Sequence, residues 1–170
     1  SALEGSYNVG GDVQVRKTVK KLDDNGNYEV IFEARGKRTS SSTPNTVDIY
    51  AVIVFDRSNS MKDDTKWANA KTAAKNFATS LHTKYNSAQI AMVTFGSEAQ
   101  VRRDFLPNDF TGMTDRQIFG YQPYSNKDQS GGTNLHAGLN AAYDLLEEKS
   151  SNSKKYVVVI SDGQPTFYYN

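Results

Sequence analysis

From residue 46 onward, short apolar runs alternate with segments in which apolar residues recur at helical spacing. Four runs favour β-strands: residues 47–55, 88–95, 99–105 and 156–161. The first and last are almost continuously apolar, as expected of strands buried on both faces of a parallel sheet, and the third suits a sheet edge. Helical spacing appears in residues 63–84 and 134–149. This alternation predicts an α/β fold with a doubly wound, mostly parallel sheet.

Residues 1–38 show a different pattern, in which apolar and polar residues alternate. Two alternating runs, residues 13–19 and 28–34, flank a turn signal at residues 23–27 and predict a β-hairpin. A lone hairpin is marginally stable in water, so we expect it to pair with strands from elsewhere. The predicted organisation is therefore a hairpin in residues 1–38, a Ser/Thr-rich linker in 39–45 and an α/β domain in 46–170.

The predicted α/β domain has fewer elements than its fold class usually contains. A doubly wound sheet commonly has five or six strands, whereas the pattern predicts four strands and two helices. We therefore expect the domain to be incomplete at its C-terminal end. Either this sequence stops within the domain, or the remaining strands come from a separate segment.

The composition excludes several classes of function. Twenty basic and nineteen acidic residues give a net charge of +1 without a basic block, so the electrostatic footprint of nucleic-acid binding is absent. No apolar run reaches about 18 residues, so the sequence predicts no membrane-spanning helix. The chain has no cysteine, which excludes disulfides and thiolate metal sites.

Three oxygen-bearing side chains follow the first buried strand: Asp56, Ser58 and Ser60, at positions i, i+2 and i+4. If the loop stays extended, these side chains point the same way and can face one point in space. A carboxylate and two hydroxyls outside the carboxyl end of a sheet strand suit a hard divalent cation. Mg²⁺ is the expected ion, with Mn²⁺ or Ca²⁺ as alternatives.

Two further segments make the pattern more specific. They are Gly131-Gly132-Thr133-Asn134-Leu135, where the second helix begins, and Ile160-Ser161-Asp162-Gly163, where the last strand ends. Together with Asp56-Arg57-Ser58-Asn59-Ser60, they resemble in order and spacing the metal ion-dependent adhesion site of von Willebrand factor A domains. The resemblance covers about residues 46–167.

The resemblance implies roles for five residues. Ser58 and Ser60 would bind the metal directly, Thr133 would do so in a high-affinity state, and Asp56 and Asp162 would act mainly through water. Neutral hydroxyl ligands would leave the ion much of its charge, so that a partner's carboxylate could complete the coordination shell. The alternative is that Asp56 and Asp162 are ordinary strand-end residues, while Thr133 is only a helix N-cap.

The loop before Thr133, residues 107–132, should border the metal face. Tyr121, Tyr124 and Asn126 lie in it, and tyrosine and asparagine are favoured at recognition surfaces. His136, one turn beyond Thr133, is a further candidate for the surface that contacts a ligand. The alternatives are a plain connecting loop and an ordinary solvated or packed helix histidine.

Lys17 stands out in the predicted hairpin because it shares a strand face with three valines. It could discourage pairing at a sheet edge, or that face could be exposed. A third alternative comes from resemblance, since hairpins that lead into an A domain look like the immunoglobulin-like stalk domains of Gram-positive pilins and adhesins. In that family a strand lysine forms an amide with an asparagine. Lys17 is our candidate for such an isopeptide bond.

These observations favour a cell-surface adhesin domain, expected in a pilus tip subunit of a Gram-positive bacterium. It would bind a host or matrix protein through an acidic side chain of that partner, and would assemble with other pilus subunits. Two alternatives are an intracellular A domain that docks a partner subunit in an ATP-driven assembly machine, and a structural filament component. We expect no enzyme, because no pair of nucleophile and base can be named.

Overall fold

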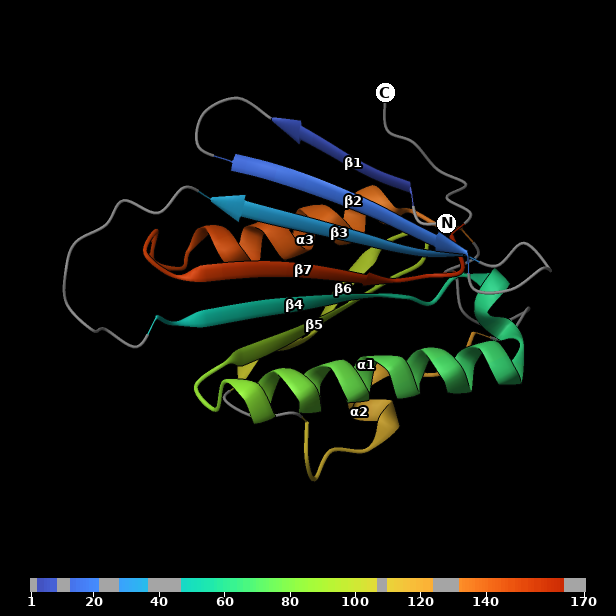
Figure 1. The fold of residues 1–170 in the computed structure, drawn as a ribbon. Helices are drawn as coiled ribbons and strands as arrows, with labels where there is room; N and C mark the ends of the chain where they lie inside the picture. Colours follow the sequence, from blue (N-terminus) through green and yellow to red (C-terminus); the bar gives the residue numbers. More distant parts are fainter. Residues whose placement is uncertain are drawn as a thin grey trace.

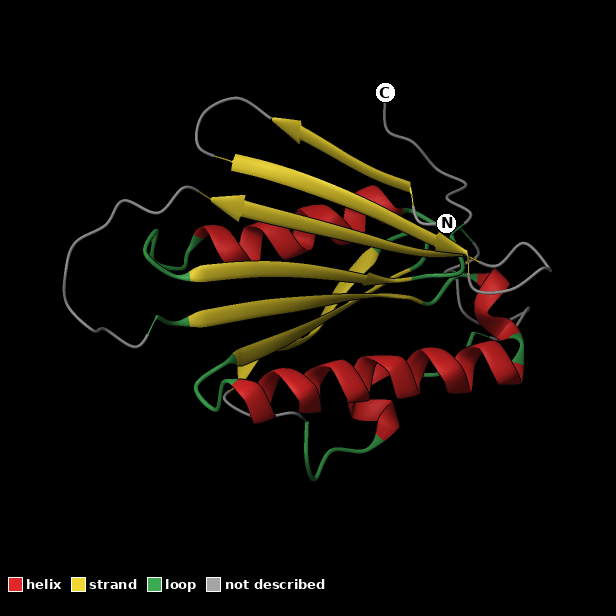
Figure 2. Ribbon diagram, in the orientation of Figure 1, coloured by secondary structure: helices red, strands yellow, loops and turns green. Residues whose placement is uncertain are grey.

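The chain forms a four-stranded α/β layer and a separate three-stranded sheet in the computed structural model (Figures 1 and 2). The structure describes residues 47–106, 110–123 and 132–163, together with the backbone of three N-terminal strands. The strands of the larger sheet are β4 (Ile49–Asp56), β5 (Gln89–Phe95), β6 (Ala99–Leu106) and β7 (Lys154–Ile160). Their order is β6-β5-β4-β7.

The sheet is mostly parallel, as predicted, with one antiparallel strand at its edge. β4 runs parallel to both β5 and β7, and β6 pairs antiparallel with β5 at the sheet edge. The carboxyl ends of β4, β5 and β7 therefore lie at one edge of the sheet. This is the edge where loops of parallel sheets commonly form binding sites.

Helices cover both faces of this sheet (Figure 2). α1 (Asp64–Lys84) and the short α2 (Asp115–Phe119) pack on one face, and α3 (Leu135–Glu147) packs on the other. A 3-10 turn, η1 (Asn59–Lys62), joins β4 to α1. The arrangement confirms the predicted doubly wound α/β fold. α2 was not predicted, since five residues are too few to show helical periodicity.

Alternating residues of β4 separate two hydrophobic cores. Ile53 and Phe55 face α1 and α2, whereas Val52 and Val54 face α3, and all four side chains are fully buried. This is the two-residue period of a strand covered on both sides.

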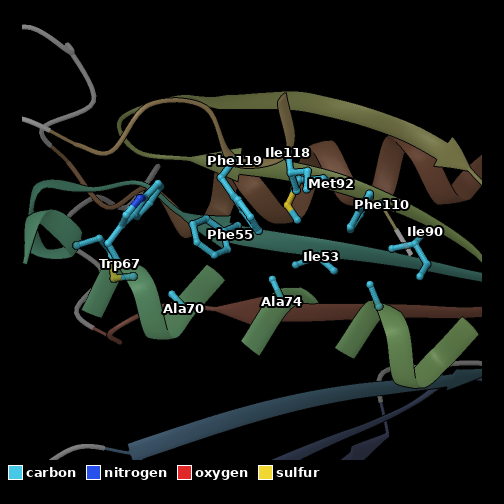
Figure 3. Packing of buried hydrophobic residues seen from close by; sticks show 12 residues of the cluster. Ile53, Phe55, Trp67, Ala70, Ala74, Ile90, Met92, Phe110, Ile118 and Phe119 are labelled. Atoms are coloured by element: carbon cyan, nitrogen blue, oxygen red, sulfur yellow. The ribbon is translucent and has the colours of Figure 1, made fainter. Parts of the chain in front are cut away.

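The core under α1 and α2 contains large aromatic side chains (Figure 3). The Phe55 ring lies 4.7 Å from the Phe119 ring and 5.3 Å from that of Trp67, centroid to centroid. Where α1 crosses the sheet it presents small residues instead, at Ala70, Ala74 and Ala78. One face of α1 thus lies close to the sheet, while aromatic rings fill the space between β4 and α2.

On the other face, a glycine brings α3 close to the sheet. A Cβ atom on Gly138 would lie 2.8 Å from Val54 Cγ1 and 3.1 Å from a ring carbon of Phe95. These distances are shorter than normal carbon contacts of about 3.5–4.0 Å, so the helix can approach this far only because position 138 has no side chain.

The burial of β7 differs from the prediction. Residues 156–161 were expected to form a strand buried on both faces, yet every residue from Lys155 to Ile160 is partly exposed. β7 is hydrogen-bonded to β4 alone and is the last strand of the four-stranded ladder, so it lies at the margin of the layer that the helices cover. A run of valines does not distinguish a central strand from a partly covered edge strand.

The N-terminal part contains the predicted hairpin, formed by β2 (Val13–Lys21) and β3 (Tyr28–Gly36), and a third antiparallel strand, β1 (Leu3–Asn8), that was not predicted. β1 pairs with β2, and β2 pairs with β3. β3 also lies alongside β7, although the hydrogen-bonded ladders of the two sheets are separate (Figure 1). β1 was missed because residues 3–8 are few and only Leu3 and Tyr7 mark an apolar face, with Gly5, a weak strand former, between them.

Lys17 lies in the central strand of this sheet. The register places it between Gly5 of β1 and Phe32 of β3. The explanation that it protects a sheet edge is therefore wrong, since β2 is paired on both sides. Its side chain and the predicted linker, residues 39–45, lie outside the described residues, and the isopeptide bond stays a prediction. No helix among the described residues is both long and apolar enough to span a bilayer.

Candidate metal centre

The predicted metal-binding residues follow strands whose carboxyl ends meet at one edge of the sheet. Asp56 is the last residue of β4, and Asp162 comes two residues after the end of neighbouring β7. Parallel pairing of these strands brings together two carboxylates that are 106 positions apart in the sequence numbering (162 minus 56).

Asp56 is fully buried and serves as an acceptor inside the loop. Its Oδ1 accepts a hydrogen bond from the backbone N–H of Ser58 at 2.7 Å, and its Oδ2 accepts one from Ser161 Oγ at 2.6 Å. Burial raises the pKa of the Asp56 carboxyl above its ordinary value, and the two serine hydrogen bonds partly offset this effect. The carboxylate is held in one orientation but lacks the solvation that a free carboxylate has in water.

The hydroxyls of the loop continue this network toward β7. Ser58 Oγ and Ser60 Oγ lie 2.8 Å apart, and Ser60 Oγ donates to Asp162 Oδ1 at 3.0 Å. The structure thus brings together four of the five predicted ligands through hydrogen bonds, directly or through Ser161.

The loop reaches this geometry by turning, not by staying extended. Ser58 is extended, with φ −65° and ψ 166°, but η1 begins at the next residue, and the Met61 N–H donates to the Ser58 carbonyl at 3.0 Å. The predicted extended loop is therefore wrong beyond Ser58. The bond from the Ser58 N–H to the Asp56 side chain starts the turn, as Asp often does in loops.

Thr133 is held at the same edge by the turn that follows β5. On one side of it, the Gly132 N–H donates to Ser97 Oγ at 3.0 Å. On the other, the Asn134 N–H donates to the Gly96 carbonyl at 2.7 Å and its side-chain amide to the Ser97 carbonyl at 3.1 Å. Thr133 itself is buried, with 4% of its surface exposed.

The N-cap of α3 is Asn134, whose side chain accepts a hydrogen bond from the Ala137 N–H at 3.0 Å. The alternative in which Thr133 serves as the N-cap is therefore wrong. The capping function lies one residue further along, which leaves a ligand role for Thr133 compatible with the start of the helix.

A lysine borders the carboxylate of Asp162. Lys66, in the first turn of α1, places its Nζ 3.2 Å from Asp162 Oδ2. Half of the Lys66 side chain is exposed, compared with 15% of that of Asp162. Both oxygens of Asp162 thus have a hydrogen-bond donor, Ser60 on one side and Lys66 on the other.

Among the predicted border residues, Tyr121 is hydrogen-bonded to the loop that follows β4, residues 56–60. Arg57 lies between Asp56 and Ser58 in sequence, and its Nε and Nη2 donate to the Tyr121 carbonyl at 3.0 and 2.7 Å. The Tyr121 ring is 55% exposed, with the Arg116 guanidinium 4.0 Å from its centre. Gly120 allows the turn from α2 to Tyr121, since its φ is +76° and a Cβ there would overlap the Arg102 guanidinium.

The other border candidates have different outcomes. His136 is exposed in the first turn of α3, and its Nδ1 lies 3.4 Å from the amide nitrogen of Asn140. Tyr124 and Asn126 lie outside the described residues. Whether any of these side chains touches a ligand stays a prediction.

Sequence reasoning missed four residues that organise this edge: Arg57, Lys66, Ser97 and Ser161. Ser161 could have been found, because it precedes Asp162 at a strand end and its hydroxyl could reach the next strand. Arg57 and Lys66 act on residues 64 and 96 positions away, and no local pattern marks such contacts.

The Ser58 and Ser60 oxygens are 2.8 Å apart, the distance of an ordinary hydrogen bond between hydroxyls. This is also close to the spacing of about 3 Å between neighbouring ligands in an octahedron with bonds of about 2.1 Å, so the distance is compatible with the predicted Mg²⁺. Within the described ranges, no group of three or more His, Asp or Glu side chains is arranged to hold a metal. The candidate centre instead consists of the Ser58 and Ser60 hydroxyls together with the carboxylates of Asp56 and Asp162, which accept hydrogen bonds from these two serines.

Solved structures with a similar fold include domains of pilus proteins. The pilus adhesin SpaC from Lactobacillus rhamnosus GG aligns over 96% of this chain at 21% identity, with a TM-score of 0.55. The vWF domain of the type V pili tip protein Mfa5 from Porphyromonas gingivalis aligns over 71% at 24% identity, also with 0.55. The pilus adhesin RrgA from Streptococcus pneumoniae aligns over 89% at 15% identity, with 0.51. At such identities the likeness establishes the fold alone.

This chain spans 21% of the SpaC chain, 40% of the Mfa5 domain chain and 25% of the RrgA chain in those structures. No curated protein sequence matches it significantly. The family model described as the von Willebrand factor type A domain matches residues 51–164, which are two thirds of the chain and contain all five predicted metal ligands. The chain therefore belongs to the von Willebrand factor type A domain family.

Proposed function

We propose that this chain is a domain of a pilus-associated, cell-surface adhesin that binds a protein partner through a divalent cation. The observation that carries the proposal is the network of oxygens at the carboxyl edge of the sheet, from Asp56 through Ser58 and Ser60 to Asp162. The fold shared with domains of pilus adhesins supports the pilus context.

The proposed ligands are Ser58, Ser60 and Thr133, with Asp56 and Asp162 behind them. Asp56 is a buried carboxylate whose pKa is raised, mainly by desolvation, so a nearby cation would relieve an unfavourable burial. A bound Mg²⁺, or Mn²⁺ or Ca²⁺ in its place, would supply positive charge toward a partner's carboxylate.

The proposed partner is a host or extracellular-matrix protein that presents an acidic side chain, and other pilus subunits would be assembly partners. The proposed location is the cell surface of a Gram-positive bacterium. We propose no catalytic activity, because Ser58 has a role in the oxygen network and no general base is assigned to it.

Calorimetric titration of the full 170-residue chain with MgCl₂ tests the first step. We expect one saturable site, which disappears in the Ser58→Ala variant and persists in Ser80→Ala, a matched change at an exposed serine of α1. Bound Mg²⁺ should also raise the melting temperature, since an ion that binds only the folded state stabilises it. Absence of saturable binding at millimolar Mg²⁺ would refute the metal site.

A second measurement tests adhesion. Surface plasmon resonance on immobilised extracellular-matrix proteins should show binding in Mg²⁺ that EDTA and Ser58→Ala abolish. The chain could bind Mg²⁺ in calorimetry and yet bind the matrix proteins equally well in EDTA and in Mg²⁺. That result would contradict the adhesive role of the ion and would mean that the ion only stabilises the loops.

A further inference from the structure

We propose that the Lys66 ammonium is a built-in competitor of the divalent cation, and that its charge sets how weakly this site binds Mg²⁺. The inference rests on the proposed function, because it concerns the same site. It assigns to Lys66 a role that the motif residues do not reveal.

The contact that carries the inference is the ion pair between Lys66 and Asp162. Nζ lies 3.2 Å from Oδ2, while the other oxygen of the same carboxylate accepts the Ser60 hydroxyl. One carboxylate therefore links the ammonium to a proposed metal ligand. A divalent cation bound at Ser60 and the Lys66 ammonium would therefore share the negative charge of the Asp162 carboxylate.

The position of Lys66 in its helix supports a role outside the helix itself. α1 begins at Asp64, its N-cap is Asp63, and the Asp63 side chain accepts the Lys66 N–H at 2.9 Å, which places Lys66 at the third helical position. Cations are disfavoured in the first turn of a helix, because the N-terminal end of the helix dipole is already positive. Helix stability therefore does not explain this lysine, whereas the charge of Asp162 does.

The exposure of Lys66 makes competition reversible. Half of the side chain is accessible to solvent, and its four-carbon stem is flexible, so the ammonium can leave Asp162 without any change in the backbone. When an ion binds, the released ammonium remains beside a site that we propose to attract carboxylates. Removing the charge should therefore strengthen binding of the ion, provided that the carboxylate keeps its hydrogen bond from Ser60.

The test is calorimetric titration of the full chain with MgCl₂, using four proteins. Lys66→Met removes the charge and keeps much of the stem, and we expect it to bind Mg²⁺ about three- to tenfold more tightly than the wild type at low salt. Lys66→Arg retains the charge and should resemble the wild type. Lys84→Met removes a charge about 27 Å further along the same helix and should also resemble it.

Salt separates an electrostatic role from a structural one. Because Lys66 is half exposed, about 0.5 M NaCl should screen its charge and reduce the difference between Lys66→Met and wild type to less than about twofold. A difference that persists unchanged at high salt would overturn the electrostatic inference.

The remaining outcomes are also decisive. If Lys66→Met binds Mg²⁺ no more tightly than wild type, or more weakly, the ammonium does not compete and the inference is wrong while the metal site stands. If neither the wild type nor any variant binds Mg²⁺, the proposed function fails, and the inference fails with it.

Discussion

Phe55 and Asp56 are neighbours at the end of β4, both fully buried, and they belong to regions with opposite chemistry. Phe55 packs against aromatic rings beneath α1 and α2, whereas Asp56 is surrounded by hydroxyl and N–H donors at the carboxyl edge. Burial at the faces of the sheet stabilises the fold. Burial at the edge instead holds polar groups in the orientation that a binding site requires, at a cost in desolvation.

The comparison teaches that the two regions should fail independently. Loss of an apolar contact on a face should reduce stability and leave ion binding intact in the folded protein. Loss of an oxygen ligand at the edge should weaken ion binding and leave the stability of the fold largely unchanged. Phe119→Ala and Ser58→Ala test this separation, whereas Gly138→Ala and Asp115→Asn measure stability alone. The four substitutions follow in order of decreasing expected effect.

The largest effect is expected from Phe119→Ala in the aromatic core. Phe119 is fully buried and its ring lies 4.7 Å from that of Phe55, so truncation should lower the free energy of unfolding by about 3–5 kcal/mol in urea denaturation. Tyr143→Ala, at an exposed aromatic residue of α3, should change it by less than about 0.5 kcal/mol. Under conditions in which Phe119→Ala is folded, its Mg²⁺ affinity should stay near that of the wild type. A large loss of affinity would show that the core and the edge are energetically coupled.

Ser58→Ala should give the next largest effect, confined to the edge. We expect the dissociation constant for Mg²⁺ to rise more than about 100-fold, which corresponds to about 2.7 kcal/mol, while the midpoint of urea denaturation without metal changes little. Calorimetry and urea denaturation on the same samples measure both quantities. A variant that unfolds readily without metal would show that the serine network stabilises the fold itself.

Gly138→Ala tests the close approach of α3. The added Cβ would lie 2.8 Å from Val54 Cγ1, and such overpacking should reduce the free energy of unfolding by about 1–3 kcal/mol.

The cost should be smaller in a Val54→Ala background, because that change removes the atom that the new Cβ would meet. A double-mutant cycle from denaturation midpoints measures the coupling. Equal costs in both backgrounds would mean that α3 shifts as a whole instead of meeting Val54.

The smallest effect is expected at Asp115, which accepts hydrogen bonds from Lys71 and Lys75 of α1. These bonds, of which the one from Lys71 has the larger effect, lower the pKa of the Asp115 carboxyl below its ordinary 3.8. The side chain is 43% exposed, so solvent screens the pair, and Asp115→Asn should cost less than about 1 kcal/mol.

The sign of the pH dependence at Asp115 follows from its lowered pKa. Its contribution should be full above the ordinary pKa and disappear as the pH falls below 3.8 through the lower folded value. Urea denaturation of wild type and Asp115→Asn at several pH values measures this, with Asp144→Asn on α3 as a control. A difference that grows in acid would contradict the assignment.

The two regions also differ in how far the sequence predicts them. The strand at 47–55 was predicted because burial on both faces makes it almost continuously apolar, and the helix at 63–84 because burial on one face imposes a helical period on its residues. β1 was missed since Gly5 leaves only two apolar residues to mark its pattern. The exposure of β7 was missed because it depends on the position of the strand in the sheet and not on its own sequence.

At the edge, the sequence predicts the donors better than the bonds between them. Asp56, Ser58, Ser60 and Asp162 could be assigned from motifs at strand ends, and the structure brings them together. The contacts of Lys66 with Asp162 and of Ser97 with Gly132 and Asn134 could not be assigned, since each joins distant segments. The N-cap in the structure, Asn134, lies one residue after the one considered from the sequence, Thr133. Both are good capping residues, and only the backbone conformation distinguishes them.

The attachment of residues 132–134 to the turn after β5 has a consequence for the thermodynamics of binding. Three hydrogen bonds to Gly96 and Ser97 fix the backbone on both sides of Thr133 when the domain folds. The conformational entropy of this segment is therefore lost during folding and need not be lost again on association. If Thr133 takes part in binding, the backbone of residues 132–134 therefore needs little further ordering.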